Sequence, residues 1–236
     1  MRRAHISLGD IAIEVTRKDV KNVHLSVHPP DGRVTLVAPT STRLEVARAF
    51  AIAKLPWIQD QRQHLREQAR ETPRRLVGRE SHYVWGRRYL LTIVALESRG
   101  KARVWLDHKR MFLAVRPDAG LGARAQVVHG WHKRLFHAAV PPLIARWERK
   151  LGVKVDAYFL QRMKTKWGSC NHGRRHIRLN TELVKKPKDL LEYVIVHEMA
   201  HLLSPRHDEA FFAILDRHYP SWREARGELN ALPLAA

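Results

Sequence analysis

The segment His197-Glu198-Met199-Ala200-His201 decides the fold that this chain of 236 residues can adopt. Two histidines four residues apart share one face of a helix, about 6 Å apart at Cβ, so both imidazoles can reach one metal ion. Glu198 lies beside them and can contact a water on that ion without ligating the ion. His207 can supply a third nitrogen once the chain turns back after the helix. The spacing therefore predicts a catalytic metal site with three protein ligands and a fourth position open to water.

The residues around this segment predict the helix that carries it. Apolar residues recur before and after it with helical spacing: Leu190, Leu191, Val194, Ile195, Leu202 and Leu203. Pro187 opens the helix, Asp189 places a negative charge in its first turn, and Ser204-Pro205 ends it. Polar groups are costly in such apolar surroundings unless something pairs with them. A bound ion therefore explains the two histidines and the glutamate better than coincidence does.

Composition favours a soluble globular protein. The chain is 44% hydrophobic and 28% charged, and no apolar run is long enough to span a bilayer. The basic residues after Met1 are followed by no apolar stretch, so we expect no secretory signal. Cys170 is the only cysteine, which excludes an internal disulfide and suits a reducing compartment. We therefore expect a cytoplasmic protein with no membrane partner, and the sequence leaves its oligomeric state open.

The formal net charge of +20 is large for a chain of this size. Such a surplus favours polyanions, namely nucleic acid, nucleotide phosphates or an acidic protein. The basic residues are spread along the chain, with local clusters at Arg74-Arg75, Arg87-Arg88, Lys164–Lys166, Arg174-Arg175 and Lys185–Lys188. Because no basic tail or recognised motif concentrates them, nucleic acid is one candidate partner among these.

The periodicity of apolar residues predicts an α+β chain in three regions, with no internal repeat. Residues 1–75 should hold antiparallel strands within residues 10–37, then helices, and a polar segment over residues 60–75 that runs into a linker. Residues 76–122 have the short alternating runs of a set of strands. Residues 123–236 contain the metal-binding motif and form the predicted catalytic region.

Two further helices are expected in this third region. The first has a helical pattern over about residues 123–151. Pro141 and Pro142 fall inside it, and because proline has no amide hydrogen to donate, we expect them to kink or divide this helix. The second should run from Asp208, its N-cap, to just before Pro220.

Three segments together resemble a known family: Lys166-Trp167-Gly168-Ser169-Cys170, Ile177-Arg178-Leu179-Asn180 and the run from Tyr193 to His201. They look like the YgjP-like metal-dependent hydrolases, which are related to the SprT-like zinc metallopeptidases. The similarity continues through His207, Phe211-Phe212 and Tyr219-Pro220-Ser221-Trp222. It is most specific over residues 166–222. It extends over about residues 10–230, which indicates one continuous family domain.

The resemblance implies a zincin-like metallopeptidase fold, in which the HExxH helix packs beside an antiparallel sheet and the metal lies between that helix and the next. It assigns the ligand roles to His197, His201 and His207, and the general base role to Glu198. The metzincins share this ligand spacing, but they place glycine where this chain has Ser204, and a methionine turn follows their third histidine. No methionine follows His207. These departures set the site apart from the metzincins and leave metal binding intact.

The third ligand and the metal each have alternatives. Related zincin sites use a glutamate further along the chain, so Glu209, Glu224 or Glu228 could replace His207, which the spacing favours. We expect Zn²⁺, bound by neutral imidazole nitrogens at about 2.0–2.1 Å. The same nitrogens also suit other divalent metals, such as manganese or nickel.

Several side chains near the motif are candidates to bind substrate. Trp167, Gly168 and Ser169 could form the edge where an extended peptide adds a strand, since glycine allows close approach of the backbone. The candidates for stabilising the oxyanion are His172, His176, Arg178, Asn180, His218 and Tyr219. The alternative for each of them is a solvated surface residue. Cys170 is expected to be a small buried residue, because no base is paired with it in the sequence.

We therefore expect a zinc-dependent metallopeptidase that uses metal-activated water with Glu198 as general base and acid. Its expected substrates are proteins or peptides, and proteins associated with nucleic acid are candidates among them. One alternative is a metal-dependent nucleoside triphosphate pyrophosphatase of the UTP type, an activity also attached to the family. Basic residues would then hold the phosphates, although three histidines and one glutamate suit a carbonyl better than a Mg²⁺-bridged triphosphate. The other alternative is a basic nucleic-acid-binding module whose zinc is structural. That module would close the fourth coordination position and have no use for Glu198.

Overall fold

The computed structural model describes residues 3–28, 32–67, 73–97 and 100–232. These residues divide into two compact units, one within residues 1–70 and the other within residues 71–235. The polar helix end and linker expected over residues 60–75 fall partly on residues 68–72, which lie outside the described residues. Among the helices described, none has both the length and the apolar character needed to cross a bilayer.

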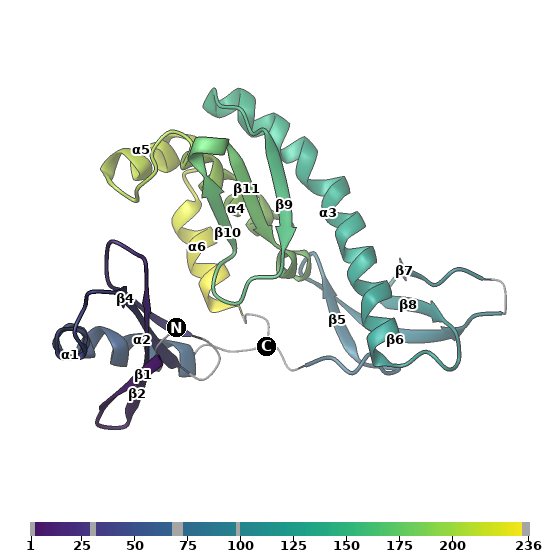
Figure 1. Ribbon diagram of the computed structural model, residues 1–236. Coiled ribbons are helices and arrows are strands. Elements are labelled where there is room, and N and C mark those ends of the chain that lie inside the picture. Colours follow the sequence, from purple (N-terminus) through teal and green to yellow (C-terminus); the bar gives the residue numbers. More distant parts are fainter. Residues whose placement is uncertain (1–2, 29–31, 68–72, 98–99, 233–236) are drawn as a thin grey trace. The chain divides into compact units, whose positions relative to one another are not determined.

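The first unit is a four-stranded sheet with two helices (Figure 1). Its elements are β1 (Arg3–Leu8), β2 (Ile11–Lys18), β3 (His24–His28), β4 (Arg33–Pro39), α1 (Leu44–Ala53) and α2 (Leu55–Glu67). Ile11 and Ile13 of β2 are buried, as the alternation along this strand predicts. They share a core with Ala47 of α1 and Ile58 of α2. The strands expected within residues 10–37 are therefore confirmed.

The order of the strands in this sheet is β1-β2-β4-β3, and β2 pairs with β4 in parallel. The prediction of antiparallel strands is wrong for this pair. The chain crosses from β2 to the far edge of the sheet, where β3 pairs antiparallel with β4, so β4 returns in the same direction as β2. Alternating apolar residues mark a strand in either direction, so the sequence pattern could not distinguish the two pairings.

The second unit begins with a sheet of the same design, although no repeat is visible in the sequence. Its strands are β5 (Ser81–Val84), β6 (Arg87–Ala95), β7 (Arg103–Asp107) and β8 (Arg110–Val115), in the order β5-β6-β8-β7. Only β6 and β8 pair in parallel. Leu91, Met111 and Leu113 of this sheet are buried, and they form one core with Val128 and Trp131 of the long helix that follows.

This helix, α3 (Leu121–Leu151), lies beside both sheets of the second unit (Figure 1). It runs unbroken through Pro141 and Pro142, so the division considered for this point does not occur. The prolines remove two amide hydrogens from the helix, but they lie on its exposed side, and the neighbouring side chains of Val140 and Ile144 are buried in the core. Packing therefore outweighs the lost hydrogen bonds.

The rest of the second unit is a three-stranded sheet packed against helices. The strands are β9 (Ala157–Gln161), β10 (Gly168–Asn171) and β11 (His176–Asn180), in the order β10-β11-β9. The helices are α4 (Lys188–Ala200), α5 (Glu209–His218) and α6 (Trp222–Ala231), together with the short turns η1 (His172–Arg174) and η2 (Thr181–Lys185). Asp208 caps α5 as expected, since its side chain accepts a hydrogen bond from the amide of Phe211 at 3.0 Å.

The antiparallel sheet that the resemblance implies beside the motif helix is only partly observed. β10 and β11 are antiparallel, but β11 and β9 are parallel. The chain leaves β9, passes β11 and enters β10 on its far side, so the loop over residues 162–167 crosses the end of the sheet. As a result, β10 is an edge strand of this sheet, and it contacts α4.

Asn180 holds this crossing loop in place. It is fully buried at the end of β11, and its amide nitrogen donates to the carbonyl oxygens of Met163, at 2.9 Å, and Lys166, at 2.7 Å. Its side-chain oxygen accepts from the amides of Met163, at 3.3 Å, and Glu182, at 3.1 Å. The Asn180 side chain therefore provides hydrogen-bond partners for backbone groups of the loop that leads into β10.

An Asn180→Asp variant should destabilise the protein, because its carboxylate can still accept from both amides but cannot donate to the two carbonyls. An Asn180→Ala variant loses all four contacts. We expect a fall in the free energy of unfolding of about 2–4 kcal/mol for the alanine variant, with a substantial part of it present in the aspartate variant. Urea unfolding measures both. If neither variant differs from the wild type, the loop does not depend on this side chain.

Candidate metal centre

The three histidines of the motif converge in the structure. His197 lies in the last turn of α4, His201 ends this helix, and His207 lies in the loop before α5. Each offers one ring nitrogen, and these atoms all lie within 4.8 Å of one another. Nε2 of His207 lies 3.1 Å from Nε2 of His197. Two nitrogens bound tetrahedrally to one zinc would be about 3.3 Å apart, so His197 and His207 already have the spacing that a shared ion requires.

No other group of three histidine, cysteine, aspartate or glutamate side chains in the described part of the chain could hold a metal in this way. The carboxylates considered as alternative third ligands do not belong to this group: Glu209, Glu224 and Glu228. The structure therefore brings His207 to the cluster, as the spacing of the sequence favours.

A tight turn after α4 returns the chain toward the cluster. The amide of Ser204 donates to the carbonyl of Ala200 at 2.9 Å, and the φ angle of Ser204 is not positive, so this turn does not need the glycine found in metzincins. The Ser204 hydroxyl donates to the carboxylate of Asp208 at 2.9 Å. Since Asp208 also caps α5, this hydrogen bond joins the turn to the next helix and holds both ends of the loop that carries His207.

The surroundings of the rings favour the neutral form of imidazole that binds a metal. Burial, followed by the neighbouring His201 and His207, lowers the pKa of His197 to about 3. Burial also lowers the pKa of His201, whose Nδ1 lies 3.1 Å from the carbonyl oxygen of Ser204. A proton on that Nδ1 leaves Nε2 of His201 available for a metal. Nδ1 of His197 is buried without a hydrogen-bond partner. The three imidazoles, with Nε2 of His197 facing the cluster, fit a divalent ion.

Glu198 is buried between α4 and the edge strand β10. Only 6% of its surface is exposed, and its carboxylate lies against the backbone of Gly168. A Cβ atom at residue 168 would lie 2.5 Å from Oε1 of Glu198 and 2.8 Å from its Cγ, so no larger residue fits there unless the carboxylate moves. Burial raises the pKa of Glu198 to about 8, against the opposing effect of the positive charge on Lys166.

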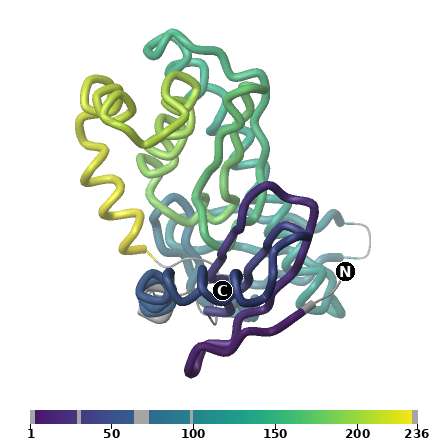
Figure 2. The backbone as a smooth tube through the Cα atoms, turned by 60° about the vertical axis from the view of Figure 1, so that its left-hand side comes forward, coloured from purple at the N-terminus to yellow at the C-terminus, as the bar shows by residue number. Residues whose placement is uncertain are grey.

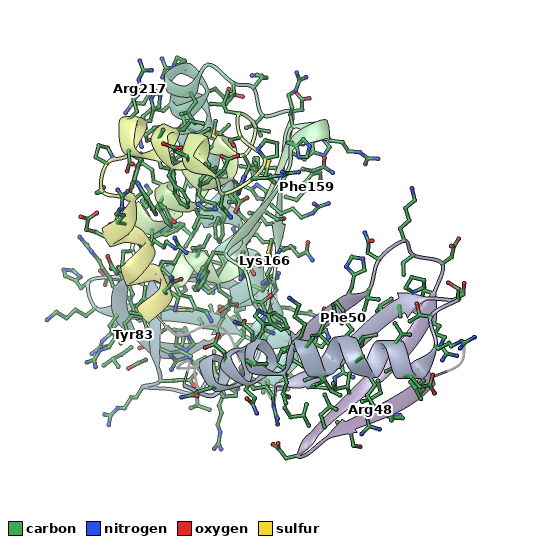
Figure 3. All side chains as sticks on the ribbon, turned by 90° about the vertical axis from the view of Figure 1, so that its left-hand side faces the viewer. Arg48, Phe50, Tyr83, Phe159, Lys166 and Arg217 are labelled. Carbon is green, nitrogen blue, oxygen red and sulfur yellow. The ribbon has the colours of Figure 1, made fainter. Side chains whose placement is uncertain are left out.

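The cluster and the carboxylate lie in the wall of one cavity of about 520 Å³. On one side, residues 165–170 form the loop and edge strand, and Lys166 of this loop is labelled in Figure 3. On the other side lies α6, which packs against α4 (Figure 2) and contributes Arg226, Leu229 and Asn230. Together with Arg206, Lys166 and Arg226 place three cations around this cavity.

Comparison with known proteins assigns a family to this arrangement. The family model for the YgjP-like metallopeptidase domain matches residues 21–232. The chain belongs to this family. The match confirms the resemblance seen in the motif, and it makes the protein a hydrolase of the metallopeptidase type, whose chemistry requires a divalent metal. Among curated proteins, no sequence matches the chain significantly.

Two solved structures of archaeal metallopeptidase zymogens also resemble this YgjP-like domain. Abylysin of Pyrococcus abyssi is 17% identical, with a TM-score of 0.35, and the match covers 37% of this chain and 89% of that one. Jannalysin of Methanocaldococcus jannaschii is 21% identical, with a TM-score of 0.34, and the match covers 39% of this chain and 87% of that one.

The cavity of this YgjP-like domain contains some of the residues predicted to bind substrate. Trp167, Gly168 and Ser169 line it, as does His172. The other candidates do not: His176, Arg178, Asn180, His218 and Tyr219. Asn180 is fully buried and holds the crossing loop, while the guanidinium of Arg178 lies over the ring of Phe159, 5.7 Å from its centroid.

The residues that line the cavity but are not predicted from the sequence as site residues include Lys166, Tyr193, Arg206, Arg226 and Asn230. Tyr193 precedes His197 by one helical turn, so the spacing of α4 could have indicated it. Burial raises its pKa to about 12, which leaves the hydroxyl protonated and able to donate. No local sequence pattern marks Arg226 and Asn230 as site residues, because they reach the cavity only through the return of α6 along α4.

Cys170 also lines the cavity, but its thiol is expected to be unreactive. Burial and the nearby Glu198 raise the pKa of its thiol to about 11, so the reactive thiolate is scarce at neutral pH. It is partly rather than fully buried.

The hydrogen bond between Ser204 and Asp208 should control metal affinity. In an Asp208→Ala variant, the turn and α5 lose their common anchor, and we expect zinc affinity to fall by about 10- to 100-fold. An Asp208→Asn variant keeps an oxygen that accepts from both Ser204 and Phe211, so it should retain most of the affinity. Competition with a chromophoric zinc chelator measures both variants. Equal loss in the two would show that the charge, and not the anchor, matters.

The raised pKa of Glu198 predicts how the stability of the metal-free protein varies with pH. The folded protein holds the proton of this carboxyl more tightly than the unfolded chain, whose pKa is near 4.5. Its contribution to stability is therefore full below about pH 4.5 and is lost as the pH rises through about 8. His197 adds no change above about pH 6.5, because its pKa is lowered in the folded state.

We therefore expect the metal-free wild type to lose on the order of a few kcal/mol of stability between about pH 6.5 and 9, relative to a Glu198→Gln variant. Urea unfolding in the presence of a chelator, repeated across this pH range for both proteins, measures the difference. Parallel pH profiles would mean that the carboxyl is not held in a buried, neutral state.

Proposed function

We propose that this YgjP-like domain is a zinc-dependent endopeptidase in which Glu198 is the general base and acid. The observation that supports this most is the arrangement of three converging imidazoles beside a buried carboxylate, in the wall of an open cavity. His197, His201 and His207 would hold the ion. A zinc ion bound there supplies Lewis acidity, which polarises a peptide carbonyl and makes water more acidic.

Glu198 suits the transfer of a proton from the attacking water to the leaving amine. Burial raises its pKa to about 8 in the metal-free site, and a bound cation would lower this pKa toward neutral pH, where a group can both accept and return a proton. The contact with Gly168 fixes the carboxylate, since the backbone of β10 leaves it little space to move. A structural zinc site would have no use for a carboxylate held in this way.

We further propose that the substrate binds as an added strand beside β10. This strand pairs with β11 on one side only, and its residues Gly168, Ser169 and Cys170 line the cavity. An extended peptide could pair with the free edge, which would place its backbone next to Glu198. Tyr193, which lines the cavity and whose hydroxyl stays protonated, is a candidate to donate to the developing oxyanion.

The cations of the cavity indicate what such a peptide would carry. Lys166, Arg206 and Arg226 surround it. We propose a preference for peptides with acidic side chains close to the cleaved bond. Proteins associated with nucleic acid remain a proposed substrate class, to which the net charge of +20 lends support.

The same cations support one second candidate, a nucleoside triphosphate pyrophosphatase, because they could hold phosphate groups. The three imidazole ligands favour the peptidase, since Mg²⁺, the usual partner of a triphosphate, prefers oxygen ligands. An assay with casein and with UTP as separate substrates distinguishes the two functions.

A Glu198→Gln variant should lower the turnover of casein by about 10²- to 10⁴-fold while the metal stays bound, because the amide cannot accept the proton. Glu209→Gln is the matched control, since this exposed residue in the first turn of α5 is not part of the cluster. Metal analysis accompanies both assays. Unchanged proteolysis by the Glu198 variant would overturn the peptidase assignment. The same holds if the wild type hydrolyses UTP but does not cleave casein.

A Gly168→Ala variant tests the contact that positions the carboxylate. We expect at least a tenfold loss of turnover with metal content unchanged, because the added methyl group must displace Glu198. Gly173→Ala is the control in the same β10–β11 connection, since the nearest atom to a Cβ at that residue is 3.8 Å away. If the two variants behave alike, Gly168 is not a positioning residue.

A further inference from the structure

The sheet formed by β5, β6, β8 and β7 has a face that the metal centre does not use. One face packs against α3 through buried residues such as Met111 and Leu113. Because side chains alternate along a strand, their neighbours point to the opposite side. The register places Trp105 directly opposite Phe112 on that side. We call it the outer face, defined by Arg88, Leu90, Arg103, Trp105, Arg110 and Phe112.

Aromatic rings and arginines alternate on the outer face. The rings of Trp105 and Phe112 are stacked, with centroids 5.0 Å apart and an angle of 7° between their planes. The guanidinium of Arg103 lies over the ring of Trp105, 5.3 Å from its centroid. Leu90 keeps 41% of its surface exposed, as does Tyr83 on the neighbouring strand. The outer face therefore exposes apolar side chains beside half-buried aromatic rings.

The stacked rings lie between two hollows with basic walls. Phe112 lines a hollow of about 950 Å³ together with Arg88, Lys109 and Arg110. Trp105 lines another, of about 460 Å³, together with Arg103.

Each hollow also holds one acidic side chain, Asp107 in the larger and Glu97 in the smaller. Asp107 is engaged by Nδ1 of His108, at 2.6 Å. Over residues 73–118 the sequence has eleven lysines and arginines against four aspartates and glutamates, so positive charge prevails around the rings.

We infer that the outer face binds single-stranded nucleic acid. Each of the two rings covers one face of the other, and Arg103 lies over Trp105. A base would extend this stack on the other face of Phe112 or take the place of Arg103 over Trp105, while the arginines on either side contact the phosphates. The bases of a duplex are already stacked on one another and cannot use such a plane, so the arrangement favours a single strand. A protein partner would suit the aromatic rings alone, but it would not explain three arginines placed around them. The inference does not rest on the metal centre or on the proposed peptidase activity.

The experiment measures binding of the full chain to a fluorescein-labelled oligo(dT) of about 15 nucleotides, by fluorescence anisotropy in the presence of a chelator. Trp105→Leu removes the stacking ring and should weaken binding by about tenfold, whereas Trp105→Phe keeps a ring and should retain most of the affinity. Joint replacement of Arg88, Arg103 and Arg110 by alanine should weaken binding by more than tenfold and reduce the dependence of affinity on salt.

The control removes three exposed arginines elsewhere, Arg48, Arg149 and Arg217, of which Arg48 and Arg217 are labelled in Figure 3. This variant should bind nearly as well as the wild type, and thermal unfolding checks that all variants are folded. Equal weakening in both arginine variants would show that net charge alone binds the strand. That result, tighter binding to a duplex of the same length, or no binding by the wild type would overturn the inference.

Discussion

The close packing of Glu198 against Gly168 is the constraint on which the rest of the site depends. It sets the distance between α4 and β10, because only a residue without Cβ allows the carboxylate to lie at the backbone of the strand. The same contact buries the carboxyl group and so raises its pKa. It also brings the free edge of β10 to the wall of the cavity that holds the three histidines. The burial of the carboxyl group, its raised pKa and the position of the β10 edge at the cavity therefore share one structural cause.

The three candidate ligands could be predicted from the sequence because their positions follow from local geometry. His197 and His201 share a helix face by their spacing, and His207 lies within reach because a turn follows directly. The other walls of the cavity depend on contacts between distant parts of the chain. Arg226 reaches the cavity only because α6 returns along α4, and no local pattern records this. Asn180 shows the converse, since a polar residue beside the motif binds backbone carbonyls and does not reach the cavity.

The fold shows the same division between local and long-range information. Alternating apolar residues correctly identify β2, and the capping residue Asp208 correctly identifies the start of α5. The direction of pairing could not be predicted, because it depends on where each connection crosses, and each of the three sheets in the described residues contains one parallel pair. The division of α3 considered at its prolines does not occur for a related reason. The local cost of the prolines is offset by packing that involves other elements.

The shared helix α3 has a consequence for how the second unit melts. Its first half belongs to the core of the β5–β8 sheet, through Val128 and Trp131, and its second half belongs to the core beneath the three histidines, through Phe136 and Trp147. Neither core can open fully while the other keeps its part of the helix intact. The two should therefore unfold as one cooperative block, with similar protection from hydrogen exchange. By linkage, any molecule that binds at one of these two cores would then also stabilise the other core against unfolding.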